Sequence, residues 1–133
     1  MGLFNKMFNG SSDAEKKSSN AENTPWVELD RLEQLDEIVK ASNEQPQLIF
    51  KHSTRCGISR MVISQFKKAY QLPEDQATLY YLDLLNHRNI SQAIADRFKV
   101  MHESPQLLVI KDGTAVAHES HGAINNMDLS KFV

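Results

Sequence analysis

Residues 47–52 place the strongest constraint on how this chain can fold. Their sequence, QLIFKH, is a short apolar run that ends in polar residues, and the polar segment 43–46 separates it from what precedes it. A continuous apolar run of this length is typical of a central strand that is buried on both faces. The rest of the chain must therefore cover two faces of a sheet, which favours an α/β fold.

Strand-like and helix-like patterns alternate on either side of this run. Apolar residues at three- and four-residue intervals predict a helix over roughly 30–42 and another in which Ile58, Met61, Val62, Phe66 and Tyr70 share one stripe that Pro73 closes. A third helix opens at 89–91, and a last short helix is expected over 125–132. Further strands are predicted at residues 26–29, 77–84, 106–111 and 114–119.

The order of these elements predicts the architecture. Asp112-Gly113 is a hairpin turn signal between two of the strands. A strand-helix-strand crossover thus leads through a helix to a hairpin and a final helix, and a mixed sheet of this kind needs helices on both faces. We therefore expect a thioredoxin-like fold, with a central mixed β-sheet flanked by helices on both faces.

The composition indicates one folded domain with a polar extension. A chain of 133 residues with 41% hydrophobic residues can bury a real core. Residues 9–24 read NGSSDAEKKSSNAENT, which offers almost nothing to bury. We expect residues 1–24 to form a flexible tail and residues 25–133 to form the thioredoxin-like domain.

Charge and cysteine content narrow the function classes. A formal net charge of −2 provides no large field that would attract nucleic acid or an anionic membrane. The single cysteine cannot form an internal disulfide, and a lone thiol suits a reducing compartment. No apolar run is long enough for a signal peptide or a membrane span. These features predict a cytoplasmic protein, expected to be a monomer, without nucleic-acid or membrane partners.

Cys56 is the residue best placed for chemistry. It lies between a buried strand and the first turn of a helix, where unpaired N–H groups and the helix dipole favour an anion such as a thiolate. Arg55 next to it adds positive charge. We interpret Cys56 as a nucleophile, and the alternative is a small buried core residue, since free cysteine is often buried.

Ser59 follows Cys56 by three residues, the place where dithiol oxidoreductases keep a second cysteine. Its hydroxyl could donate to the Cys56 thiolate from the same helix face, so we predict a catalytic role for it. The alternative is an ordinary polar residue that helps to cap the helix.

Ser104-Pro105 stands immediately before a predicted strand, as the cis-proline turn of a thioredoxin-like site requires. Proline at a strand start is also an ordinary turn feature. His52 could form a hydrogen bond near the thiol. No dense set of cysteine, histidine and carboxylate residues indicates a metal site, so no bound metal is expected.

The combination of these motifs resembles the monothiol bacilliredoxins. The resemblance covers residues 26–133 and rests on FKHSTRCGIS at 50–59, HESPQ at 102–106, IKDG at 110–113 and Ser120-His121. It implies a redox-active protein of the stress response that removes bacillithiol from S-thiolated proteins by thiol-disulfide exchange. Bacillithiol would be a low-molecular-weight thiol co-substrate, with no permanently bound cofactor.

The resemblance also implies which residues hold the substrate and where this chain departs from the family. Arg55, Gly57, Ser104 and Pro105 would bind the mixed disulfide around Cys56. The family commonly has a proline where Gly57 stands and a small polar residue where Arg55 stands. A tryptophan often follows the Ser-His pair, where this chain has Gly122.

Two other functions fit parts of the sequence. Cys56-Gly57-Ile58-Ser59 also resembles the C-G-F-S loop of monothiol glutaredoxins, which hold glutathione and an iron-sulfur cluster, although residues 122–125 lack the G-G-x-D stretch of those proteins. A thioredoxin-fold module that only binds a partner, with an unreactive Cys56, is the third reading.

Overall fold

The computed structural model of the chain describes residues 24–133. Strands and helices alternate along most of this range. Their order is β1 (Trp26–Glu28), α2 (Gln34–Ala41), β2 (Gln47–His52), α3 (Gly57–Ala69), β3 (Thr78–Asp83), α4 (Arg88–Phe98), β4 (Gln106–Lys111), β5 (Thr114–Ser120) and the 3-10 helices η3 (His121–Asn126) and η4 (Leu129–Phe132). The predicted tail, residues 1–24, lies outside the described residues except for Thr24, and its flexibility stays a prediction.

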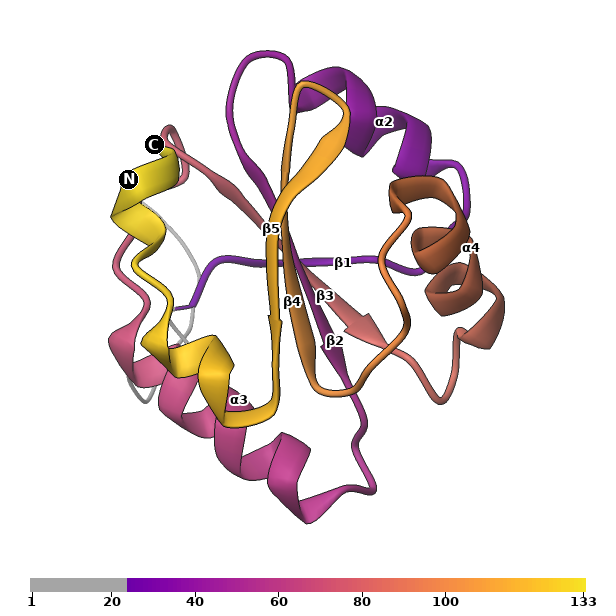
Figure 1. Cartoon of the computed structure of the whole chain (residues 1–133), viewed down its shortest axis with the longest axis vertical. Coiled ribbons are helices and arrows are strands. Elements are labelled where there is room, and N and C mark those ends of the chain that lie inside the picture. Colours follow the sequence, from indigo (N-terminus) through magenta and orange to yellow (C-terminus); the bar gives the residue numbers. More distant parts are fainter. Residues whose placement is uncertain (1–23) are drawn as a thin grey trace, which may run out of the picture.

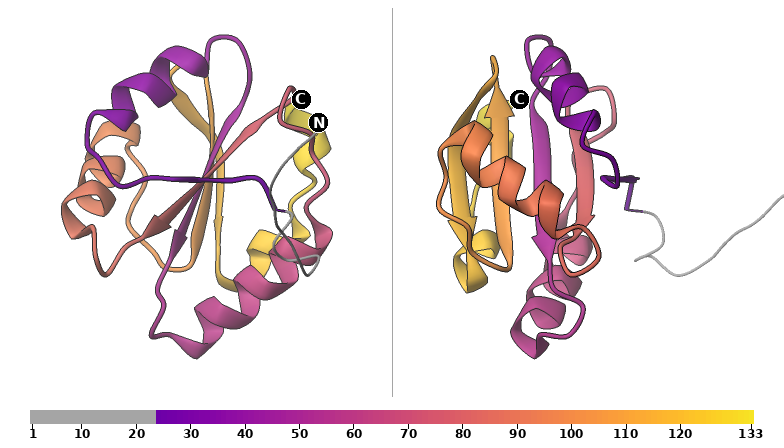
Figure 2. Two further views of the ribbon diagram at one scale, coloured as in Figure 1. Left: turned by 180° about the vertical axis from the view of Figure 1, so that it is seen from behind. Right: turned by 90° about the vertical axis from the view of Figure 1, so that its right-hand side faces the viewer.

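The strands form a mixed sheet in the order β1-β3-β2-β4-β5, which the right-hand view of Figure 2 shows face on to the side that α2 and α4 cover. β1, β3 and β2 run parallel, whereas β4 is antiparallel to both β2 and β5. Figure 1 looks along the sheet from one edge, with α2 and α4 on one side and α3 with the 3-10 helices on the other. The predicted fold class, a thioredoxin-like α/β fold with helices on both faces, is confirmed.

Residues of β2 alternate between two apolar cores, one on each face of the sheet. Ile49 packs with residues of α2 and α4, and Leu48 and Phe50 pack with Val62, Ile63 and Phe66 of α3. All six side chains of β2 are buried. This is the central strand that the continuous apolar run predicts, because side chains of a strand point alternately to its two faces.

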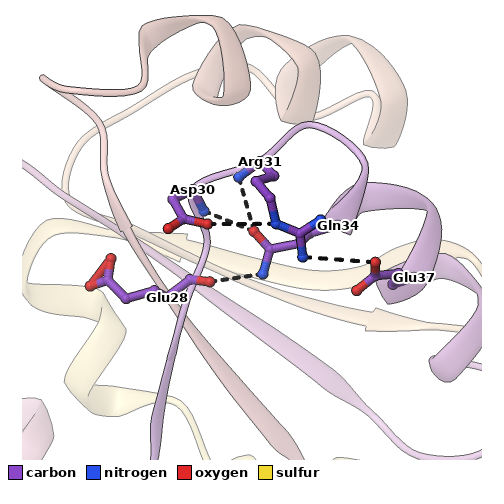
Figure 3. Close-up of polar contacts among 5 residues, drawn as sticks. All are labelled: Glu28, Asp30, Arg31, Gln34 and Glu37. Carbon is purple, nitrogen blue, oxygen red and sulfur yellow. Dashed lines mark hydrogen bonds and ion pairs between the residues drawn. The ribbon is translucent and has the colours of Figure 1, made fainter.

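Helix α2 begins at Gln34, four residues later than the predicted start. The buried Gln34 side chain explains the delay, because its Oε1 accepts the backbone N–H groups of Asp30 and Arg31 at 2.8 and 2.9 Å (Figure 3). Its Nε2 donates to the Glu28 carbonyl at 2.8 Å. These bonds hold the segment before the helix as a turn.

The buried stripe of α3 differs from the predicted one. Ser59, Val62, Ile63 and Phe66 face the sheet, whereas Ile58 and Met61 are 55% and 56% exposed. The buried positions follow the i, i+3, i+4, i+7 spacing of one helix face. Ile58 and Met61 lie beside that face, one position before Ser59 and Val62. The predicted stripe included them because they are apolar, and it was therefore partly wrong.

The C-terminal segment also differs from the prediction of one short helix. Two 3-10 helices replace it, separated by Met127 and Asp128, which are both extended. The carboxylate of Asp128 accepts the N–H of Ser130 at 3.2 Å and so starts a separate turn. The predicted hairpin at Asp112-Gly113 is confirmed, and both residues have the positive φ values that a two-residue hairpin turn favours.

Candidate active site

One edge of the sheet gathers the segments that the sequence analysis selected. The carboxyl end of β2 leads into the Cys56 loop, and Lys51 of β2 pairs with Gln106 at the start of β4. Gln106 in turn pairs with Ser120 at the end of β5. The β2–α3 loop, the α4–β4 connection and the end of β5 therefore meet at the lower end of the molecule in Figure 1.

Cys56 is the N-terminal cap residue of α3. Its backbone is extended, its N–H donates to the Ser53 carbonyl at 3.2 Å, and its carbonyl accepts the N–H of Arg60 at 3.0 Å. The thiol is free and half-buried. The sulfur thus lies at the positive end of the α3 dipole, and the first N–H groups of the helix have no acceptor within the helix.

Arg55 and Gly57 are exposed on either side of Cys56. A Cβ atom built at Gly57 meets no atom within 4 Å, so the start of α3 leaves open space beside the cysteine. Arg55 forms no ion pair with any residue in the range 24–133. Its guanidinium is therefore available to an anionic group of a ligand.

Ser59 is completely buried, and its hydroxyl is bonded to residues other than Cys56. The Oγ atom lies 2.7 Å from Nδ1 of His52 and accepts the backbone N–H of Ser53 at 3.1 Å. Among the described residues no hydrogen bond joins Ser59 to Cys56. The predicted donation to the thiolate is therefore not formed in this structure, because the hydroxyl is bonded to His52 and to the Ser53 N–H.

His52 ends β2 on the face that α3 covers. Its ring stacks at a tilt against Tyr81, with 5.8 Å between ring centroids, and Asp83 stands opposite it on β3. Burial lowers the pKa of His52, while Asp83 opposes this shift and Lys67 and Arg60 reinforce it. The predicted hydrogen bond of His52 near the thiol is thus made to Ser59.

Ser104 and Pro105 stand at the start of β4, and the peptide bond between them is cis, as the sequence predicts. Pro105 is buried, and its carbonyl accepts the N–H of His121 at 3.0 Å. The Oγ atom of Ser104 is buried without a hydrogen-bond partner in the described structure. The turn is therefore anchored to the end of β5, and it brings Ser104 to the same edge as Cys56.

A buried lysine behind the site was not found by the sequence analysis. Lys51 is 0% exposed, and its Nζ donates to Oε1 of Gln106 at 3.1 Å. Gln106 then donates through Nε2 to the Met101 carbonyl at 3.0 Å. Burial lowers the pKa of Lys51 to about 8. The only sequence signal is its position directly after the apolar Leu48-Ile49-Phe50 and still within the predicted strand.

The described residues offer neither a metal-binding group nor a membrane-spanning helix. No group of three or more histidine, cysteine or acidic residues in 24–133 could hold a metal ion. In the same range, no helix has the length and apolar character needed to cross a membrane. The chemistry that the edge supports is nucleophilic attack by a single sulfur, at a helix start and beside a cis-proline turn.

Solved structures similar to this chain are thioredoxin-fold proteins. An oxidoreductase candidate with a thioredoxin fold matches with a TM-score of 0.69 and 29% identity, covering 86% of this chain and 97% of that one. Thioredoxin f from spinach chloroplast (long form) matches with a TM-score of 0.62 and 15% identity, covering 85% and 88% of the two chains. Thioredoxin O2 from Arabidopsis thaliana, in the oxidised state, matches with a TM-score of 0.57 and 18% identity, covering 81% and 88%.

Fold and site together define a thioredoxin-fold redox thiol protein. The family model described as monothiol bacilliredoxin BrxC matches residues 27–129, which is most of the chain. The chain therefore belongs to the monothiol bacilliredoxin family. The resemblance seen in the sequence motifs is confirmed.

Proposed function

We propose that this protein is a monothiol thiol-disulfide exchange enzyme that removes bacillithiol from protein mixed disulfides through Cys56. One observation carries the proposal: the only cysteine of the chain caps α3 at the sheet edge that also holds the cis Ser104–Pro105 turn. The family supports bacillithiol as the thiol that is transferred.

The reaction consists of two exchanges with no net oxidation. The Cys56 thiolate attacks the bacillithiol sulfur of the mixed disulfide; a Cys56–bacillithiol disulfide forms, the original S–S bond breaks, and the substrate protein leaves as a thiolate. A second thiol from solution then attacks the bacillithiol sulfur on Cys56. This forms a disulfide between bacillithiol and that thiol and returns the Cys56 thiolate.

The residues around Cys56 have separate roles in this proposal. The open space at Gly57 admits the incoming disulfide. The exposed Arg55 attracts carboxylates of the substrate. Ser104, whose hydroxyl lacks a partner, and Pro105 bind the substrate backbone from the opposite side of the site.

The proposal includes the setting in which the enzyme works. A single reduced cysteine is suited to the cytoplasm, where mixed disulfides accumulate during oxidative stress. We propose that the protein acts there as a monomer on S-thiolated proteins, with bacillithiol as a transient co-substrate and no permanently bound cofactor.

The decisive test follows the removal of bacillithiol from a thiolated protein by mass spectrometry. Wild-type protein with excess reduced thiol should release the modified protein as a free thiol faster than the thiol alone does, and Cys56→Ser should add nothing to that uncatalysed release. Ser64→Ala, on the exposed outer face of α3, is the matched control and should act like wild type. Equal release with wild type and Cys56→Ser would contradict the proposal.

Two further measurements separate the alternative functions. The same substrate carrying glutathione should be processed more slowly, and a preference for glutathione would contradict the bacillithiol assignment. Anaerobic addition of iron, sulfide and glutathione should leave the protein colourless. A coloured product would favour the glutaredoxin-like function.

A further inference from the structure

His52 and Ser59 form a buried polar pair close in sequence to Cys56. His52 is 6% exposed and Ser59 is 0% exposed, and their side chains meet at 2.7 Å. The Ser53 N–H also donates to the Ser59 hydroxyl, at 3.1 Å. The pair therefore joins the end of β2, the cysteine loop and the first turn of α3.

The number of protons available restricts what this pair can do. A serine hydroxyl has one O–H to donate and two lone pairs to accept, and the Ser53 N–H occupies one lone pair. If Nδ1 of His52 carries no hydrogen, the Ser59 O–H donates to it and is fully used. If Nδ1 carries a hydrogen, His52 donates, both lone pairs of Ser59 are occupied, and the O–H is free for another acceptor.

Cys56 is the candidate for that acceptor. It caps the helix whose first turn contains Ser59, and the two residues are three positions apart. The structure has the Ser59 hydroxyl bonded to His52 and Ser53 and not to Cys56. The bond to the sulfur requires that the hydroxyl be released.

We propose that His52 is a positioning residue that acts on Cys56 through the hydroxyl of Ser59. A hydrogen on Nδ1 directs the Ser59 O–H to the Cys56 thiolate, and a bare Nδ1 withdraws it. The inference rests on the proposed function only in taking Cys56 to react as a thiolate.

The number of hydrogens on the His52 ring depends on pH, and the groups around the ring influence its pKa. Asp83 and Tyr81 of β3 and Arg60, Lys67 and Ser59 of α3 are the titratable and polar groups that face the ring. Burial, the largest influence, lowers the pKa of His52 and so favours the neutral imidazole. Acidification adds the second ring proton and forces Nδ1 to donate.

The test is the rate at which iodoacetamide alkylates Cys56 between pH 5 and 9, which is unambiguous in a chain with one cysteine. The wild-type profile should contain two ionisations, one of the thiol and one of His52. Ser59→Ala should keep only the first and react about tenfold more slowly at acid pH, the loss expected for one hydrogen bond to a charged group.

His52→Asn supplies the complementary result. The Asn amide places a permanent donor near the position of Nδ1, so the reaction should stay as fast as wild type at acid pH while the second ionisation disappears. His118→Asn, on the exposed face of β5, should keep the wild-type profile. A single ionisation in wild type, or two in Ser59→Ala, would overturn the proposal.

An NMR titration covers the case in which a variant does not fold. The imidazole signal of His52, assigned through its contact with the Tyr81 ring, should change its titration midpoint when Cys56 is alkylated. An unchanged midpoint would overturn the inference. Alkylation of Cys56 requires no bacillithiol. The inference about His52 can therefore be confirmed or overturned independently of whether the protein removes bacillithiol from its substrates.

Discussion

Lys51 is a single buried residue that connects β2 to the segment before β4 through hydrogen bonds. A buried ammonium group without a carboxylate partner is costly, and here its recorded partner is the neutral amide of Gln106. That amide also holds the Met101 carbonyl, in the connection that carries Ser104 and Pro105. The lysine therefore links the central strand to the cis-proline turn at the expense of stability.

This cost predicts how stability depends on pH. The pKa of Lys51 is about 8 in the folded protein and returns to its usual value near 10.5 on unfolding. Between these values the unfolded chain binds more protons, so folding becomes more favourable as pH rises. The free energy of unfolding should increase, relative to that of Lys51→Met, by about 2 kcal/mol from pH 8 to pH 10.

Urea unfolding of both proteins at several pH values measures this difference. Because both retain the same tyrosines, the ionisation of tyrosine cancels in the comparison. Lys68→Met removes an exposed lysine of α3 and should run parallel to wild type. Parallel curves for wild type and Lys51→Met would show that the buried lysine keeps its ordinary pKa.

The partners of single residues were the part of the site that the sequence predicted least. Cys56 and Pro105 could be selected because each has a characteristic neighbourhood along the chain. The partner of Ser59 could not, because it depends on which face of α3 meets the sheet. The burial of Lys51 depends likewise on the pairing of β2 with β4.

The start of α3 is the feature with the clearest consequence at the scale of an element. Gly57 is the first residue of the helix, with open space around it. Cys56 before it has φ −99° and ψ 123°, a conformation that is compatible with a following proline. Proline is favoured at the first helical position, where its missing N–H costs no intrahelical bond.

Gly57→Pro should therefore stabilise the protein. The expected gain in the free energy of unfolding is about 0.4–1 kcal/mol, because proline restricts the unfolded chain without straining the folded one. Chemical denaturation measures it. Ser64→Pro, in the middle of the same helix, should destabilise by about 3 kcal/mol or more. A destabilised Gly57→Pro would show that the helix start is more constrained than its geometry indicates.

Elements differed in how well their sequences predicted them. β2 and β4 were predicted with their observed bounds, because each has a continuous apolar centre between polar ends, as expected of a strand buried on both faces. The predicted start of α2 was wrong, because the side chain of Gln34 bonds to three backbone groups of the preceding segment. The prediction of a single C-terminal helix was wrong, because Asp128 starts a separate turn.

The whole molecule explains why segments distant in sequence form one site. The parallel pair β2–β3 and the antiparallel pair β2–β4 place the end of β2 beside the start of β4. The topology therefore brings Cys56 and Pro105 to one edge, as the thioredoxin-like fold predicted from the sequence led us to expect. The topology does not determine which thiol is transferred. The proposal of bacillithiol is based on the family.

The central claim is that one sulfur carries the reaction through an obligatory mixed disulfide. Intact-mass spectrometry of the chain, quenched with acid during turnover of a bacillithiolated protein, tests it most directly. The proposal predicts one bacillithiol per chain, attached to Cys56, which disappears when excess reduced thiol is added. Turnover without any adduct on Cys56, or an adduct that no thiol can remove, would contradict it.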